Sequence, residues 1–315
     1  LKHHLRADPV ERVLQRDDTG PETRVFLQRV QDIRSFAVND LGLSDTRNYR
    51  TYYEAERDFL VAVVQAAPEF SVEAHMFRYP FFGDLPYKGF YDVGAAKAEA
   101  KQLEKQGLDV YVRKVDAFSS LGFFSDPLFS FIQDYRPDRL AELIIHEQTH
   151  ATIFIKGHAK FNEQLGTFAG RKGAEEYIAR QYGRDSSEYA LMMDRRHDAK
   201  LFRRDMAALA AELQALYSSG ADRETMRKKK RQLIDRFQRQ FSEGYESRYT
   251  TAAYTGLADM EINNAYISLF RIYETQNSFF EELYAWAGDI KSMLTYLQEA
   301  PGLKKDPWSV RVPEG

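Results

Sequence analysis

One stretch restricts the fold of this chain more than any other: residues 137–155, which read PDRLAELIIHEQTHATIFI. Its Pro-Asp start is typical of the beginning of an α-helix. His146 and His150 are four residues apart, so a helix places both imidazoles on one face. The apolar residues around them indicate a buried helix, and buried polar groups without partners are costly. The stretch therefore predicts a buried helix whose two histidines share a ligand.

The spacing H-E-x-x-H suits a metal ion. Two imidazoles at this separation can each bind one Zn²⁺ at about 2.0–2.1 Å. Glu147 follows the first histidine and points slightly around the helix, so it can act as a general base without being a ligand. This is the zincin arrangement. We predict His146 and His150 as metal ligands and Glu147 as the catalytic base; the alternative is a pair of core histidines with protein partners.

A third ligand has to come from the residues that follow. His158 lies eight residues after His150, whereas metzincins place their last histidine six residues after the second and require a glycine that is absent here. Gluzincins use a glutamate on the next helix, and Glu163 follows Asn162 near a predicted helix start. We therefore predict Glu163 as the third ligand and His158 as a loop residue near the cleft.

The segment between the two predicted helices supports this choice. Residues 156–160, KGHAK, predict a turn that reverses the chain and lays the second helix, about 161–182, against the first. Gly166 and Gly170 are four residues apart on one face of that helix. Because glycine has no side chain, the two helix backbones can approach closely there.

The rest of the chain predicts an α+β fold that is mainly helical. Helices are expected at 22–43 and at about 52–66, short strands and turns at 74–94, a helix at 95–107 and a strand at 109–118. A long helical hairpin is expected at about 187–241, either as a packed structural element or as an arm for a partner, and a further helix at 258–276. The small β-sheet thus precedes the H-E-x-x-H helix in the sequence.

We expect the 315 residues to form a single zincin-like catalytic domain in three parts. These parts are N-terminal helices (1–68), the sheet with the metal-binding helices (69–182), and a helical C-terminal part that includes the hairpin (183–315).

Composition excludes several classes of protein. The chain has no cysteine, which excludes disulfides, thiolate metal sites and a cysteine nucleophile. Its net charge of −3 does not favour nucleic-acid binding. The basic run 227–232 is expected on the solvated face of a helix, with a phosphate-binding patch as the alternative. No apolar run is long enough to span a membrane. The sequence does not indicate an oligomeric state.

Five stretches together resemble the putative zinc aminopeptidases, a bacterial family of gluzincin-type metallopeptidases: 84-DLPYKGFYD-92, 109-DVYVRKVDAFSSLGFFSDPL-128, 145-IHEQTH-150, 161-FNEQLGTF-168 and 262-INNAYISLFRIY-273. The resemblance implies an aminopeptidase with one Zn²⁺ per chain that acts on short peptides with free N-termini. A zinc endopeptidase, or a zinc-binding scaffold with weak peptidase activity, remains the alternative, because no segment like the G-x-M-E-N of other aminopeptidases is present. The resemblance also implies a location in the cell envelope or periplasm, and a start at Leu1 in place of Met is compatible with a removed export segment.

Substrate contacts are predicted in two places. In gluzincins an edge strand binds the peptide backbone by strand addition, and the strand-like segment 115–127 is the candidate here, with an ordinary inner strand as the alternative. The developing oxyanion needs a second electrophile, for which a tyrosine hydroxyl is suitable. The candidate substrate-binding residues are Ser119, Ser120, Leu121, Gly122, Tyr87, Tyr254, Tyr266 and Asn263.

Overall fold

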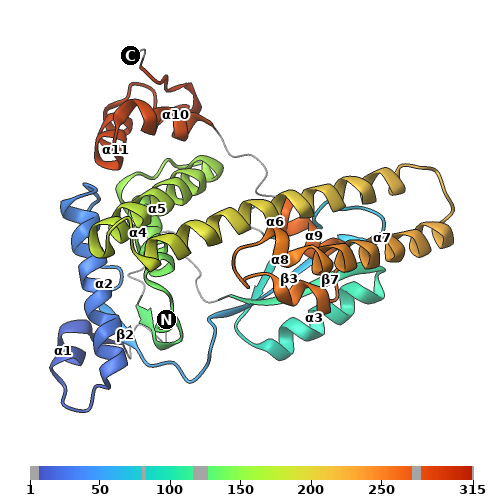
Figure 1. Cartoon of the computed structure of the whole chain (residues 1–315), viewed down its shortest axis with the longest axis horizontal. Coiled ribbons are helices and arrows are strands. Elements are labelled where there is room, and N and C mark those ends of the chain that lie inside the picture. The colour runs from blue at the N-terminus through green and yellow to red at the C-terminus, as the bar shows by residue number, and fades with distance from the viewer. Residues whose placement is uncertain (1–6, 80–82, 116–126, 272–277, 314–315) are drawn as a thin grey trace. The chain divides into compact units, whose positions relative to one another are not determined.

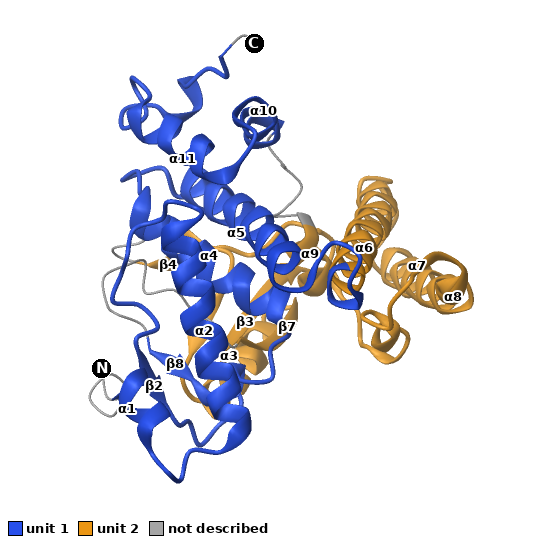
Figure 2. Cartoon of the chain, turned by 60° about the vertical axis from the view of Figure 1, so that its left-hand side comes forward, with its two compact units in different colours: residues 1–58, 118–189, 276–315 blue, residues 59–117, 190–275 orange. Residues whose placement is uncertain are grey.

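The computed structural model describes residues 7–79, 83–115, 127–271 and 278–313. Helices dominate and the sheets are small, which is the α+β content expected (Figure 1). The contacts divide the chain into two compact units (Figure 2). Unit 1 comprises residues 1–58, 118–189 and 276–315, and unit 2 comprises residues 59–117 and 190–275. These boundaries differ from the three consecutive parts expected, because segments distant in sequence pack together within each unit.

Unit 1 is a group of helices with one small sheet. Its strands are β1 (Asp8–Pro9), β2 (Thr51–Tyr53) and β8 (Leu128–Phe129), in the order β1-β2-β8; β1 pairs with β2 antiparallel and β8 pairs with β2 parallel. Its helices are α1 (Val10–Gln15), α2 (Pro21–Asn39), α4 (Pro137–Thr152), α5 (Ala159–Tyr182), α10 (Ser278–Ala287) and α11 (Ile290–Glu299), with short 3₁₀ helices η1 (Ser130–Ile132) and η3 (Pro307–Ser309).

The helices α4 and α5 form the centre of unit 1 and make its most extensive contact (Figure 1). α4 begins at Pro137 and buries Leu140, Ile144 and Ile145. α2 packs against both helices and buries an apolar stripe that includes Val30 and Ile33. The two predicted metal-site helices are confirmed with bounds within three residues of those expected.

Unit 2 combines a three-stranded antiparallel sheet with helices. The strands are β3 (Val61–Pro68), β6 (Lys88–Phe90) and β7 (Leu108–Val115), in the order β6-β3-β7, and β4 (Phe77–Tyr79) and β5 (Gly83–Leu85) form a separate hairpin. The helices are α3 (Val93–Lys105), α6 (Ser187–Tyr217, nearly all of it in this unit), α7 (Arg223–Glu243), α8 (Tyr245–Arg248) and α9 (Asn264–Arg271), with the 3₁₀ helix η2 (Thr255–Asp259).

The prediction of a helix at about 52–66, and with it of an N-terminal part made only of helices, is wrong. Residues 61–68 are strand β3, and 51–53 are strand β2. Ala62, Val64 and Ala66 belong to an apolar cluster with α3, while α9 also contacts the sheet. Seven successive residues of β3 are buried as a result, so the strand lacks the alternation of apolar and polar residues that marks a half-exposed strand.

The helical hairpin is confirmed as α6 and α7. Asp222 caps the beginning of α7 by accepting a hydrogen bond from Thr225 N at 2.9 Å. In the basic run, Lys228, Lys229 and Arg231 are exposed as expected. Lys230 is not: it is buried and donates to the carbonyl of Glu69 at 3.0 Å. Among the described residues, no helix combines the length and the apolar character needed to cross a membrane.

Candidate metal centre

Three side chains from α4 and α5 converge at one point. The Nε2 atoms of His146 and His150 are 2.9 Å apart. Glu163, in the second turn of α5, places Oε1 3.4 Å from His150 Nε2 and Oε2 3.6 Å from His146 Nε2. The structure thus brings the three predicted metal ligands together. Among the described residues, these three side chains form a group that could hold a metal ion.

The three donors fit a zinc ion. Two ligand atoms that share a tetrahedral Zn²⁺ at about 2.0–2.1 Å are about 3.3 Å apart. The observed separations, from 2.9 to 3.6 Å, lie on both sides of this value. Two imidazoles and one carboxylate are also a ligand set of catalytic zinc sites, which leave a fourth position for water.

The electrostatics leave His146 and Glu163 in the forms that bind a cation. Burial, together with the nearby His150, lowers the pKa of His146 to about 4, although the charge of Glu163 acts in the opposite direction. The imidazole is therefore neutral at neutral pH. The hydrogen bond with His150 lowers the pKa of Glu163, against the effect of burial, so its carboxylate is ionised. A neutral nitrogen and an anionic oxygen are both ligands for a divalent cation.

Glycines on α5 allow this convergence. A Cβ on Gly166 would lie 2.8 Å from Cε1 of His150, and one on Gly170 would lie 2.8 Å from the carbonyl oxygen of Glu142. Gly173 repeats the pattern one turn later, 2.7 Å from a methyl group of Leu41. The expected close approach at Gly166 and Gly170 is confirmed. The role of Gly173 was missed, although it continues the same helix face.

The site is open on one side. The side chain of His150 is 4 % exposed, whereas that of Glu163 is 55 % exposed. Glu147 lies on α4 directly after the first ligand and is half-buried. One buried and one partly exposed histidine, an accessible carboxylate and an adjacent glutamate can bind a metal ion and present it to a ligand from solvent. These features define the class: an H-E-x-x-H helix completed by a carboxylate from the next helix.

Comparison with known proteins identifies the family. The family model described as "Putative aminopeptidase" matches residues 1–312. The chain therefore belongs to the putative aminopeptidase family, which implies a peptidase and hence a hydrolase. No curated protein and no solved structure matched the chain.

The residues predicted to bind substrate fall into two groups. Ser119, Ser120, Leu121 and Gly122 fall outside the described residues, as does most of the predicted substrate strand. The other four are in unit 2, and their roles as substrate contacts stay predictions.

The unit 2 candidates have neighbours within that unit. Tyr254 stacks on Phe202 at 4.1 Å between ring centroids, and Tyr266 contacts Tyr111 edge to face. Asn263 donates from Nδ2 to the carbonyl of Val110 at 2.8 Å. The carbonyl of Tyr87 accepts a hydrogen bond from the Tyr79 hydroxyl at 3.4 Å. These contacts help to hold unit 2 together whether or not the side chains also meet a substrate.

Two residues near the metal centre differ in importance. His158 precedes α5 and donates from its backbone N to the carbonyl of Ile155 at 3.1 Å, and its side chain is not part of the ligand cluster. Asn162 was noted only as a neighbour of Glu163. It is buried and bonds to both backbone groups of Ile155. The signal that could have identified it is an amide directly after the apolar Phe161 and directly before the candidate ligand Glu163.

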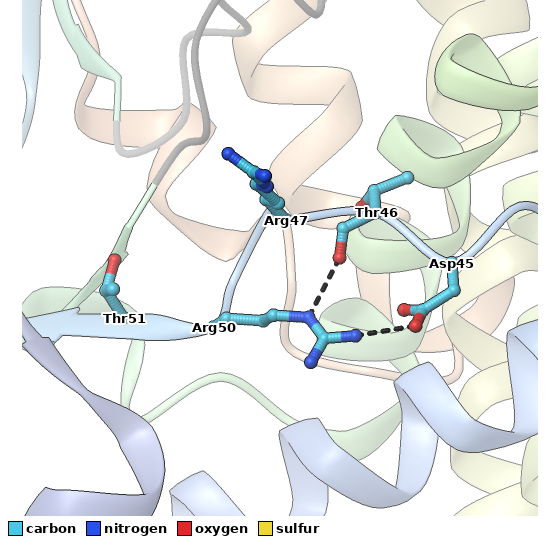
Figure 3. Close-up of a pocket in the computed structure, with 5 residues that line it drawn as sticks. All are labelled: Asp45, Thr46, Arg47, Arg50 and Thr51. Atoms are coloured by element: carbon cyan, nitrogen blue, oxygen red, sulfur yellow. Dashed lines mark hydrogen bonds and ion pairs between the residues drawn. The ribbon is translucent and has the colours of Figure 1, made fainter.

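A separate hollow of about 490 Å³ follows α2 in unit 1 and is lined by Asp45, Thr46, Arg47, Arg50 and Thr51 (Figure 3). Arg50 donates to Asp45 Oδ2 at 2.6 Å and to the carbonyl of Thr46 at 3.1 Å. The preceding residue, Ser44, donates from its backbone N to Thr152 Oγ1 at 2.9 Å. Thr152 lies two residues beyond His150, on the opposite side of α4. The Arg50 bonds close the loop on itself and the Ser44 bond fastens it to α4, and the hollow is not part of the metal centre.

Proposed function

We propose that this protein is a zinc-dependent aminopeptidase with a zincin-like site of the gluzincin type, acting on short peptides with free N-termini. The observation that carries the proposal is the convergence of His146, His150 and Glu163 within 4.8 Å of one another. Membership of the putative aminopeptidase family supports the choice of peptides as substrates.

Each residue has a distinct role in this proposal. His146, His150 and Glu163 would hold one Zn²⁺, which when bound supplies a Lewis acid that activates water and polarises the peptide carbonyl. Glu147 accepts a proton from the attacking water as the new carbon–oxygen bond forms. It then donates that proton to the amine as the carbon–nitrogen bond breaks. The neutral state of His146 suits its role, because a protonated imidazole cannot bind a cation.

The role of Glu147 can be separated from that of the ligands. Glu147→Gln keeps the shape of the side chain but removes the base, so we expect zinc content to stay near one ion per chain while hydrolysis falls by roughly 10²–10⁴-fold. The measurement combines metal analysis with an assay of a short unblocked peptide. The control is His150→Ala, which should lose both zinc and activity. Loss of zinc from Glu147→Gln would contradict the assignment.

The direction of attack needs its own test. An aminopeptidase binds the free ammonium group of its substrate, so acetylation of the N-terminus should abolish cleavage. Matched free and N-acetylated peptides of the same sequence, compared by mass spectrometry of the products, test this. Internal cleavage of both peptides at equal rates would identify an endopeptidase with the same metal centre.

A further inference from the structure

The position of Glu163 depends on the backbone that carries it. Its side chain is half-exposed, and within the described part of the chain the recorded ion-pair partners of its carboxylate are His146 and His150. No described hydrogen bond from outside this trio fixes the carboxylate. The carboxylate therefore stays beside the two histidines only if the first turns of α5 are held in place.

Asn162 is the side chain that holds this part of α5. It is 2 % exposed, and both polar atoms of its side-chain amide form hydrogen bonds with the backbone of a single residue. Nδ2 donates to the carbonyl of Ile155 at 2.9 Å, and Oδ1 accepts from the backbone N of Ile155 at 2.9 Å. Ile155 lies after the end of α4, so its backbone N–H and carbonyl groups take no part in the hydrogen bonds of that helix. Asn162 thus closes the turn between the two metal-site helices.

Two neighbouring features make this closure specific. Gly157, inside the turn, has φ +84°, a conformation that glycine adopts readily, so the chain can reverse within a few residues. Phe161 is fully buried and packs edge to face against Trp308, with ring centroids 4.9 Å apart. These features set where α5 begins, while the Asn162 amide links that start directly to the end of α4.

We propose that Asn162 is a positioning residue of the metal centre: by binding both backbone groups of Ile155 it holds the first turns of α5 so that Glu163 completes the ligand set. This inference rests on the proposed function, since it assumes that the site binds a metal. It assigns Asn162 no contact with the metal or with the substrate.

The test is a double-mutant cycle on zinc affinity. Competition with a chromogenic chelator measures zinc binding to the full chain, its Asn162→Ala and Glu163→Ala variants, and the double variant. Outer partners of metal ligands typically contribute about 10–100-fold in affinity, and we expect Asn162→Ala to lose about that much. If Asn162 acts through Glu163, then Asn162→Ala should change affinity by less than about twofold once Glu163 is alanine, because coupled residues are not additive. Full affinity in Asn162→Ala, or equal losses in both backgrounds, would overturn the proposal.

The chain offers a matched control in Asn264. It is fully buried in unit 2 and donates to the carbonyls of Pro68 and Glu69 at 3.0 and 2.9 Å. Asn264→Ala should lower the thermal stability of the protein but leave zinc affinity unchanged. If both asparagine variants lose affinity in proportion to their loss of stability, Asn162 has only a structural role and the proposal fails.

A milder variant covers the case in which Asn162→Ala does not fold. Asn162→Asp keeps the shape and the acceptor for the Ile155 N–H but loses the donor to its carbonyl, so zinc affinity should fall measurably. Unchanged affinity in a folded Asn162→Asp protein also overturns the proposal. If the unaltered protein binds no zinc at all, it is the proposed function that fails.

Discussion

The helix pair α4–α5 in unit 1 and the helix pair α6–α7 in unit 2 pack by opposite means. Between α4 and α5 the backbones come close, because glycines face the neighbouring helix at Gly166, Gly170 and Gly173. Between α6 and α7 large rings fill the space, such as Phe202 and Phe241 at 5.8 Å between centroids. The first arrangement brings polar groups from two helices to one point, and the second buries apolar area.

This difference teaches where each pair can tolerate change. A glycine that faces an imidazole leaves no room even for a methyl group, so the contact at α4–α5 is specific and easily lost. An aromatic cluster contributes free energy of unfolding through buried area, at about 25 cal/mol per Å² of apolar surface. We therefore expect substitutions in the two pairs to separate metal binding from stability.

The largest expected effect is a loss of stability when an aromatic ring between α6 and α7 is removed. Phe202 is 2 % exposed and its ring contacts those of Tyr254, Phe241 and Phe270. Phe202→Ala should lower the free energy of unfolding by about 3–5 kcal/mol, because it removes apolar area and leaves a cavity. Denaturant unfolding measures this loss. Zinc affinity of the folded fraction should not change; a parallel loss of affinity would show that the two helix pairs are not separable.

Removing the third ligand should have the next largest effect, on zinc rather than on stability. Glu163→Ala should reduce zinc affinity by more than about 100-fold, which exceeds the usual effect of an outer partner of a ligand. His158→Ala serves as the control and should leave affinity unchanged. Metal analysis after dialysis distinguishes them, and the reverse order would contradict the proposed gluzincin-type site.

A single methyl group should be enough to disturb the α4–α5 contact. Gly166→Ala places Cβ within 2.8–3.2 Å of both imidazoles, so the helices must separate or the rings must turn. We expect a cost of about 1–3 kcal/mol in stability and a loss of zinc affinity. Gly256→Ala is the matched control, since a Cβ there has no neighbour within 4 Å. Normal zinc binding by Gly166→Ala would falsify the idea that close approach at this residue is required.

The smallest effect concerns a polar group beside the aromatic cluster. Asp198 is fully buried, and burial acts to raise its pKa, but hydrogen bonds from Thr250 and Thr251 outweigh this and leave the pKa below its ordinary value. A carboxyl with a lowered pKa in the folded state stabilises the protein above its ordinary pKa, and that stability disappears as the pH falls through the folded value. Acid unfolding should therefore be less steep below about pH 4 in Asp198→Asn than in the unaltered protein. Identical pH profiles would exclude this contribution.

Much of the candidate metal centre could be predicted because it depends on the spacing of residues close together in the sequence. Two histidines four residues apart share a helix face in any α-helix, and Gly166 and Gly170 follow the same rule on the next helix. The helices α4, α5, α6 and α7 begin and end close to their predicted bounds for similar reasons: proline, glycine, a capping aspartate and apolar periodicity all act within a few residues.

Strand β3 shows where local spacing fails. Its residues Val61–Ala67 are buried throughout, so their pattern contains no alternation and resembles that of a buried helix. What makes it a strand is its pairing with β6 on one side and β7 on the other, and β7 begins forty residues after β3 ends. The division into two units has the same origin, since each unit gathers segments that the sequence separates.

The sequence by itself thus determined the candidate ligands, their helix faces and the glycines between the helices, because helix geometry places residues three or four positions apart on one face. Only the tertiary structure decided how far apart the three donor atoms lie, that Asn162 joins the start of α5 to Ile155, and that β3 is a strand. These outcomes depend on which segments meet, and that is set by the packing of side chains from distant parts of the chain, which a local pattern does not contain.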